Sequence, residues 1–542
     1  MKSKQKTLIT ITMLLCVTIF LCAFSTFRGE NGTGNANVVS SRTPVEQERS
    51  GMIWSHSFLS SGTTSYNSIP IISGNVIYLV NSNTLYELNK KGDIERQMTL
   101  CAKMNSVCYM LLEGSHLYIP LSGGIMECVN IQSMTSEWRS TGFGGQSLST
   151  VFYHKGYLYA GCTTITNRGT TGIFYCLDAV NGSVLWTYED TKHPGGYYWS
   201  GSIVYEDTLY FSGDNGILVA HSLLTDEIYD THSLTETAKI RAGITFDVQT
   251  NALYTVSNDG ILYQIRTKNG KIDEVNSTYL VENASGINCT STPTIYQGRI
   301  YVGCMANRKG LISVIDAEQL KVLYNVEGLP NAEIKSSPLV STRGETDGSV
   351  YVYVSANALP GGIYYFIDRP TTTVSTLQTL FTPATAQQFC LSSITADGDG
   401  TLYYSNDSGT FFAVGEITAN SNVGNSIIPS HKPTPLVTPT QTNKSSQKSK
   451  KSVTKPKKPG NIHMKKKGKK KIRLTWKKNT KRSQTILYLK YGSGKWKKRI
   501  IKKKTSVTLS QKQKKLHIRL RCRKKIKGLW YYSNYTKTFL LK

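Results

Sequence analysis

Two carboxylates in the second half of this 542-residue chain have a spacing that suggests metal chemistry. Asp397 and Asp399 stand in the sequence Asp-Gly-Asp-Gly, and carboxylate oxygens grouped in a turn are compatible with Ca²⁺. The sequence around them lacks the further ligands of a complete calcium-binding loop, so a turn between strands explains them better. We therefore keep Ca²⁺ only as a candidate cofactor and predict no firm metal site.

A cluster of aromatic side chains suggests ligand binding instead of catalysis. His193, Tyr197, Tyr198 and Trp199 lie within seven residues of sequence, and aromatic rings offer stacking surface to an extended peptide or a glycan. The alternative is that Trp199 only opens a buried strand. We predict that these four residues form a binding face for a protein or glycan.

The sequence lacks the motifs of several common enzyme classes. It contains no Gly-rich phosphate loop, no nucleophile elbow and no zinc-ligand spacing. Cys162 and Cys304 occupy equivalent places in the repeats described below and are expected to be small buried residues. Cys289 with Cys304 is the one disulfide worth testing. No catalytic residue is predicted, and the chain is expected not to be an enzyme.

The elements that must position these residues are strands. Residues 172–190 predict a hairpin of Ile173–Leu177 and Ser183–Tyr188 around an Asn-Gly turn, whose two residues accept positive φ at low cost. A related pattern recurs over residues 50–417 with a period of about 40 residues, which is typical of a propeller. The second strand of each repeat ends in Tyr, at positions 78, 118, 159, 210, 254, 301, 351 and 403.

These eight repeats predict an all-β fold, an eight-bladed β-propeller, with seven blades as the fallback. Met52–Ser55 has the pattern of a last strand with no strands before it, whereas residues 389–414 supply only three strands. Joining the two would close the ring and remove an exposed edge. The repeated tyrosines and Trp54, Trp138 and Trp186 are expected to pack one blade on the next.

The hairpin resembles the repeat of the PQQ-like (quinoprotein alcohol dehydrogenase-like) β-propellers through Leu177-Asp178-Ala179, Asn181-Gly182 and Leu185-Trp186. Quinoprotein dehydrogenases of that family use a catalytic Asp near Ca²⁺, a Trp beneath the quinone and often a vicinal Cys pair. This chain has no vicinal Cys pair, so PQQ is not expected. It looks more like the family's non-enzymatic propellers, with a quinone- or Ca²⁺-dependent extracellular oxidoreductase, or a degenerate enzyme, as the alternative.

The N-terminus predicts export. Three lysines precede an apolar run at residues 8–27, so residues 1–28 are a signal peptide or a retained membrane anchor, and residues 29–49 a polar spacer. The propeller should then lie on the extracellular face of the membrane, or be secreted and associated with the wall.

The C-terminal part is strongly basic. Of 64 Lys and Arg, 38 follow Glu416, where no acidic residue occurs, so residues 1–416 carry −9 and the remainder +38. Residues 418–460 predict a disordered linker. Residues 461–542 alternate as strands of a small β-sandwich and resemble the Lys-rich fibronectin type III-like modules of exported Gram-positive proteins. A polycation there should bind teichoic acid or anionic lipid, with nucleic-acid binding incidental.

Overall fold

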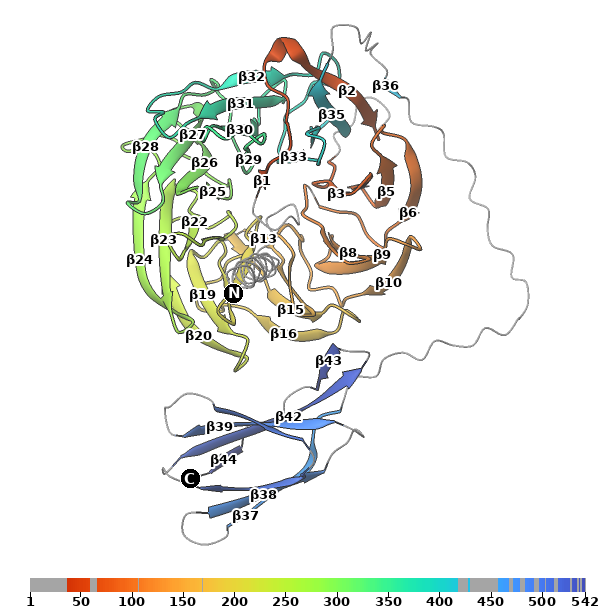
Figure 1. Cartoon of the computed structure of the whole chain (residues 1–542), viewed down its shortest axis with the longest axis vertical. Coiled ribbons are helices and arrows are strands. Elements are labelled where there is room, and N and C mark those ends of the chain that lie inside the picture. The colour runs from red at the N-terminus through yellow and green to blue at the C-terminus, as the bar shows by residue number, and fades with distance from the viewer. Residues whose placement is uncertain are drawn as a thin grey trace, which may run out of the picture. The chain divides into compact units, whose positions relative to one another are not determined.

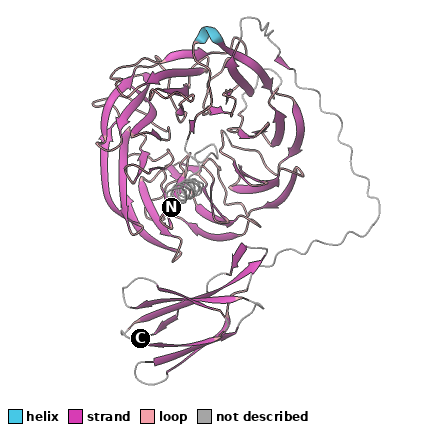
Figure 2. Ribbon diagram, in the orientation of Figure 1, coloured by secondary structure: helices cyan, strands magenta, loops and turns pink. Residues whose placement is uncertain are grey.

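The computed structural model describes residues 37–58, 66–105, 107–167, 169–417 and 427–428. Towards the C-terminus it describes residues 457–466, 471–477, 483–491, 497–502, 504–510, 515–526, 529–533, 536 and 539–541. The chain divides into two compact units, Met1–Lys432 and Pro433–Lys542. Apart from the 3-10 helix η2 (Gln47–Arg49), the described elements are strands (Figure 2). The predicted export segment, residues 1–28, lies outside the described residues.

The described strands of the first unit form eight blades around a ring, numbered in chain order (Figure 1). Each blade has four antiparallel strands, and a parallel fifth strand is added to blades 7 and 8. Blade 1 comprises β3 (Ile71–Ser73), β4 (Val76–Asn81), β5 (Thr84–Asn89) and β6 (Ile94–Thr99), and blade 2 comprises β7 (Leu111–Glu113), β8 (His116–Leu121), β9 (Ile125–Asn130) and β10 (Thr135–Arg139). Blade 3 comprises β11 (Phe152–His154), β12 (Tyr157–Gly161), β15 (Phe174–Asp178) and β16 (Val184–Tyr188). Blade 4 comprises β17 (Ser202–Tyr205), β18 (Thr208–Phe211), β19 (Ile217–Ser222) and β20 (Glu227–Ser233).

Blade 5 comprises β21 (Thr245–Asp247), β22 (Ala252–Val256), β23 (Ile261–Lys268) and β24 (Lys271–Tyr279), and blade 6 comprises β25 (Thr294–Tyr296), β26 (Arg299–Ala306), β27 (Lys309–Asp316) and β28 (Lys321–Val326). Blade 7 comprises β29 (Leu339–Ser341), β30 (Val350–Ser355), β31 (Ile363–Asp368) and β32 (Gln378–Phe381). Blade 8 comprises β33 (Thr395–Ala396), β34 (Leu402–Ser405), β35 (Thr410–Glu416) and the N-terminal strand β2 (Ser50–Ser57). A small hairpin, β13 (Thr164–Thr166) and β14 (Gly169–Thr171), is inserted in blade 3.

The ring closes through its first long strand, as the sequence predicted. β2 pairs antiparallel with β35, from Ser50 opposite Glu416 to Ser57 opposite Thr410. β36 (Ile427–Ile428) then adds to β2 in parallel, so two residues of the segment predicted as a linker extend the last blade. Closure gives β35 a partner along its length, which removes an exposed edge of the last blade.

Packing between blades uses the repeated aromatic residues. All eight second-strand tyrosines are buried, which confirms their predicted packing role. The indole Nε1–H of Trp54 donates to the Lys90 carbonyl at 2.7 Å, and that of Trp138 donates to the Ala179 carbonyl at 3.2 Å, each in the next blade. Trp186 packs on His221 of blade 4, with ring centroids 4.4 Å apart. The indoles therefore join neighbouring blades by both packing and hydrogen bonding.

The hairpin that defines the repeat differs from its predicted turn. β15 and β16 form it as expected, but of the Asn-Gly pair only Gly182 has positive φ, at 67°. Its N–H donates to the Asp178 carbonyl at 2.8 Å, and the Asp178 N–H donates to the Ser183 carbonyl. The loop is therefore longer than a two-residue turn, and the register shifts beside it.

Part of the predicted spacer is structural. β1 (Val38–Val39) pairs in parallel with β29 of blade 7. Thr43 is fully buried, its hydroxyl lies 2.9 Å from the Tyr353 hydroxyl, and that hydroxyl donates to the Pro44 carbonyl at 2.8 Å. A polar composition suggested a free spacer, but these hydrogen bonds fix residues 37–45 against blade 7.

The second unit is a β-sandwich. One sheet contains β37 (Gly460–Lys466), β38 (Lys471–Lys477) and β41 (Ser506–Ser510); the other contains β40 (Lys497–Ile501), β39 (Gln484–Tyr491), β42 (Leu516–Ile526) and β43 (Leu529–Tyr532), with β44 (Phe539–Leu541) also paired to β42. Leu474 and Trp476 of one sheet pack in a shared core with Leu487 and Ile518 of the other. Alternating apolar residues thus give each sheet one buried face.

Candidate functional site

The aromatic segment predicted as a binding face connects β16 of blade 3 to β17 of blade 4. His193 is exposed, and its Nδ1 lies 3.7 Å from Asp190 Oδ2. Tyr198 and Trp199 are half-buried, with ring centroids 4.7 Å apart. These three side chains are therefore accessible to a ligand, wholly or in part.

Tyr197 does not belong to this accessible set. Only 4% of it is exposed, and its ring packs against Phe174 and Phe211 at centroid distances of 5.3 and 6.1 Å. A Cβ on Gly161 would come within 2.4 Å of it, so the backbone of β12 needs glycine there. The prediction that Tyr197 contacts a ligand was wrong, because its side chain points into the core between blades 3 and 4.

Tyr198 is held by a buried ion pair. The Arg241 guanidinium lies 4.4 Å from the centre of its ring and donates to both carboxylate oxygens of Asp214, at 2.9 and 2.8 Å. Thr170 of the β13–β14 hairpin donates to the same carboxylate at 2.7 Å. Burial acts to lower the pKa of Arg241, but hydrogen bonds and charge from Asp214 raise it overall. This network joins blade 3, blade 4 and blade 5 beneath one aromatic ring.

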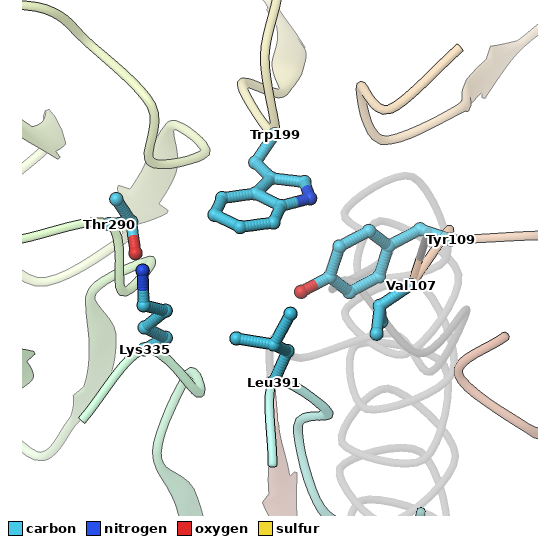
Figure 3. A pocket seen from close by; sticks show the side chains of 6 residues that line it. All are labelled: Val107, Tyr109, Trp199, Thr290, Lys335 and Leu391. Atoms are coloured by element: carbon cyan, nitrogen blue, oxygen red, sulfur yellow. The ribbon is translucent and has the colours of Figure 1, made fainter. Parts of the chain in front are cut away.

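Trp199 reaches the axis of the propeller. It lines a small cavity with residues that precede the first strands of other blades, and Figure 3 shows their side chains converging on one space: Val107, Tyr109, Thr290, Lys335 and Leu391. The Lys335 Nζ lies 5.7 Å from the centre of the Trp199 indole and 3.1 Å from Glu333 Oε2. The Thr290 hydroxyl is buried and has no hydrogen-bond partner among the described residues. The cavity volume is about 10 Å³, close to the space of one water.

Two further features lie in the connections on this face of the propeller. Trp199 has φ of 60°, a left-handed conformation that costs a bulky residue about 1–3 kcal/mol and that clusters at ligand sites. Burial raises the pKa of Asp407 to about 6. Tyr66 has a raised pKa, first through burial and then through the charges of Asp407 and Tyr198. Sequence reasoning missed Arg241, Lys335, Tyr66 and Asp407, because their contacts are between blades and no local pattern predicts them.

The candidate calcium pair, Asp397 and Asp399, contacts a cation of the protein itself. The Lys90 ammonium lies 3.1 Å from Asp397 Oδ2 and also bonds Asp399. Asp397 Oδ1 accepts from the N–H groups of Asp399 and Thr401, at 2.9 and 3.0 Å, as in an Asx turn. The described residues hold no cluster of three or more metal-ligating side chains. These hydrogen bonds fit the turn between strands that the sequence favours, and Ca²⁺ stays a candidate cofactor only.

The cysteine predictions had mixed outcomes. Cys162 and Cys304 are both buried at the ends of second strands, as expected. Cys289 and Cys304 are free thiols, and Cys289 Sγ instead lies 3.2 Å from the Gly303 carbonyl. Both thiols lie in one apolar cluster, which suits Cys as a small hydrophobic residue.

These features define the first unit as a β-propeller. Residues 43–274 match the model of the family described as outer membrane protein assembly factor BamB. No curated protein matches the chain significantly in sequence.

Solved structures share the fold at low identity. The chain is 11% identical to quinohemoprotein alcohol dehydrogenase ADHIIG from Pseudomonas putida HK5, with a TM-score of 0.54, covering 80% of this chain and 83% of that one. It is 12% identical to quinohemoprotein alcohol dehydrogenase from Comamonas testosteroni, with a TM-score of 0.53, covering 70% and 79%. BamB from Moraxella catarrhalis gives 14% identity and a TM-score of 0.47, covering 67% and 97%.

The axial cavity between Trp199, Tyr109 and Lys335, at about 10 Å³, is much smaller than the roughly 300–1,000 Å³ of typical small-molecule sites. Among the described residues, no helix is long and apolar enough to cross a membrane.

Proposed function

We propose that this chain is an exported, non-enzymatic protein of the cell envelope. The axial face of its propeller recognises a protein, peptide or glycan, and its basic C-terminal module retains it on anionic envelope polymers. The observation that carries the first half is the aromatic and cationic cluster at the axis, where Tyr198 lies against Arg241 and Trp199 against Lys335. Aromatic and arginine side chains dominate recognition sites because they bury large areas at low entropic cost.

Exposed apolar residues on the same face support this proposal. The connections between strands two and three, and between consecutive blades, meet at one end of a propeller. Ile165, Leu359 and Phe389 lie in such connections and are 66%, 61% and 44% exposed. Loops on a rigid scaffold carry binding, and exposed apolar side chains on one face favour a protein partner.

The test is a binding screen of the full chain against immobilised peptides and glycans. Variants Trp199→Ala and Leu359→Ser should weaken any specific binding at least about tenfold. Val180→Ser and Leu224→Ser are matched controls, because these residues are 65% and 51% exposed in turns at the opposite end of the blades. Equal effects of all four variants would argue against an axial recognition face.

The second half of the proposal rests on charge and topology. The order β37-β38-β41 in one sheet and β40-β39-β42-β43 in the other supports a fibronectin type III-like module. The chain after Glu416 has 38 basic and no acidic side chains, so a polyanion outside the cell is its natural partner. Teichoic acid and anionic lipid both supply closely spaced phosphates, and nucleic acid would bind only incidentally.

Retention is tested by washing cell envelopes with increasing salt. Full-length protein should remain bound at low salt and be released as salt screens its charges, whereas protein truncated after Glu416 should wash off at once. Retention of both forms through high salt would assign anchoring to residues 1–28 instead. Release of both at low salt would remove the basic module from the proposal.

An oxidoreductase is the competing function, because two of the similar folds are quinohemoprotein alcohol dehydrogenases. The absorption spectrum of protein purified from its native host decides between them. A quinone or haem band would favour the oxidoreductase, and its appearance would overturn the non-enzymatic proposal.

A further inference from the structure

The β-sandwich has a surface groove that is lined by both cationic and aliphatic side chains. It lies between β40 and β41, has a volume of about 370 Å³, and is lined by Arg499, Ile500, Ile501, Lys502, Lys504, Ser506 and Val507. The lining therefore combines three cationic side chains with three aliphatic ones, within a stretch of nine residues.

The floor of the groove continues into the protein core. β40 and β41 are the end strands of their sheets among the described residues, so the groove follows the open side of the sandwich. Ile501 is 9% exposed and packs in the core between the sheets, and Val507 packs against the same core. Ile500 is 39% exposed. An apolar ligand group placed here would cover Ile500 and extend the existing core contacts.

The rim of the groove is cationic. Arg499, Lys502 and Lys504 are exposed, and the sequence after Glu416 contains no Asp or Glu to offset them. Cationic side chains on or beside an edge strand, such as Arg499 of β40, also discourage pairing with other chains. That protective role requires no apolar floor, whereas a ligand with an anionic head and an aliphatic stem matches both the rim and the floor.

We propose that this groove binds an anionic membrane phospholipid, with the phosphate at the rim and the adjoining methylenes on Ile500 and Val507. The proposal rests on the proposed function, in which the basic module binds envelope polyanions, and it names the lipid as the specific ligand. A soluble polyphosphate chain has no aliphatic part and gains nothing from the floor of the groove. Interfacial binding of this kind combines burial of apolar area with attraction to anionic lipid.

The experiment measures binding of the full chain to vesicles of phosphatidylglycerol and phosphatidylcholine, to pure phosphatidylcholine vesicles, and to soluble polyphosphate. The rim variant is Arg499→Gln, Lys502→Gln and Lys504→Gln together. Its control is Lys465→Gln, Lys471→Gln and Arg473→Gln, which removes the same charge from exposed positions on β37 and β38. A third variant, Ile500→Asn, keeps every charge. All variants carry the same N-terminal segment, and thermal unfolding verifies that each is folded.

We expect the rim variant to bind phosphatidylglycerol vesicles about 100-fold more weakly and the control at most about fivefold more weakly. Ile500→Asn should lower vesicle binding about fivefold and leave polyphosphate binding unchanged. Equal losses in both triple variants, with no effect of Ile500→Asn, would overturn the lipid groove while leaving charge-based retention intact. Lowered polyphosphate binding in the rim variant alone would assign the groove to soluble polyanions. No binding of the unmodified chain to either probe would refute the retention function itself.

Discussion

Lys90 joins the first blade to the last: its ammonium lies 3.1 Å from the Asp397 carboxylate, whose side chain is only 1% exposed. Hydrogen bonding to Asp399 raises the pKa of Lys90 despite partial burial, so the amine stays charged over the working range of pH. The Lys90 carbonyl also accepts the Trp54 indole N–H of blade 8. Lys90 thus makes polar contacts with Asp397, Asp399 and Trp54 across the junction of blade 8 with blade 1.

Removing this cation should weaken ring closure. Lys90→Met leaves the buried Asp397 carboxylate without its counter-charge, and we expect a loss of about 2 kcal/mol in the free energy of unfolding. Urea denaturation of the full chain measures it. Lys155→Met is the control, because Lys155 pairs with Asp207 at 3.6 Å where both side chains are at least half exposed. A loss as small as the control's would show that the pair does not secure the ring.

Gly182, which lies against the Trp138 indole, should be required for the stability of the propeller. A Cβ on Gly182 would come within 2.3 Å of the Trp138 ring, whereas a Cβ on Gly156 would meet nothing within 4 Å. Both residues have positive φ, so Gly156→Ala reports the backbone cost alone, about 1 kcal/mol. Gly182→Ala should lose at least about 2 kcal/mol more, since the indole must move. Equal melting temperatures of the two variants would contradict the packing of blade 2 on blade 3.

Substitutions of the neighbouring residues Tyr197 and Tyr198 should differ sharply in their effect on stability. Tyr197→Ala empties a buried site against Phe174 and Phe211 and should cost about 3–5 kcal/mol of stability. Tyr198→Ala removes a half-buried ring and its contact with Arg241, and should cost about 1 kcal/mol. Chemical denaturation compares them directly. A milder effect of Tyr197→Ala than of Tyr198→Ala would return Tyr197 to the accessible face.

Asp407 should make stability depend on pH. Burial raises its pKa from 3.8 to about 6, so ionisation favours the unfolded chain. Its unfavourable contribution is absent below pH 4, grows as pH rises from about 4 to 6, and is constant above. The free energy of unfolding of Asp407→Asn should therefore match that of the unmodified protein at pH 4 and exceed it by about 1 kcal/mol at pH 7. This difference is reduced because Asp407 is partly in contact with water. Thermal unfolding at both pH values measures this, and an equal difference at each would contradict it.

Sequence alone determined the features that depend on local pattern. Eight recurring strands ending in Tyr, the strand that completes the last blade, and the alternation of the C-terminal strands all follow from periodicity, because each residue's face of a strand is fixed by its position. The division between an acidic body and a basic tail is likewise a property of composition.

Tertiary structure decided which polar groups meet. Lys90 pairs with the two carboxylates considered for Ca²⁺, and Tyr197 turns inward while Trp199 reaches the axis. Arg241, Lys335 and Asp407 lie near residues that are far from them in sequence. Residues 37–45 were predicted as spacer, yet β1 and Thr43 bind blade 7. Contacts between distant residues depend on how the ring closes, and no local pattern encodes the partner of a charged or aromatic side chain across that ring.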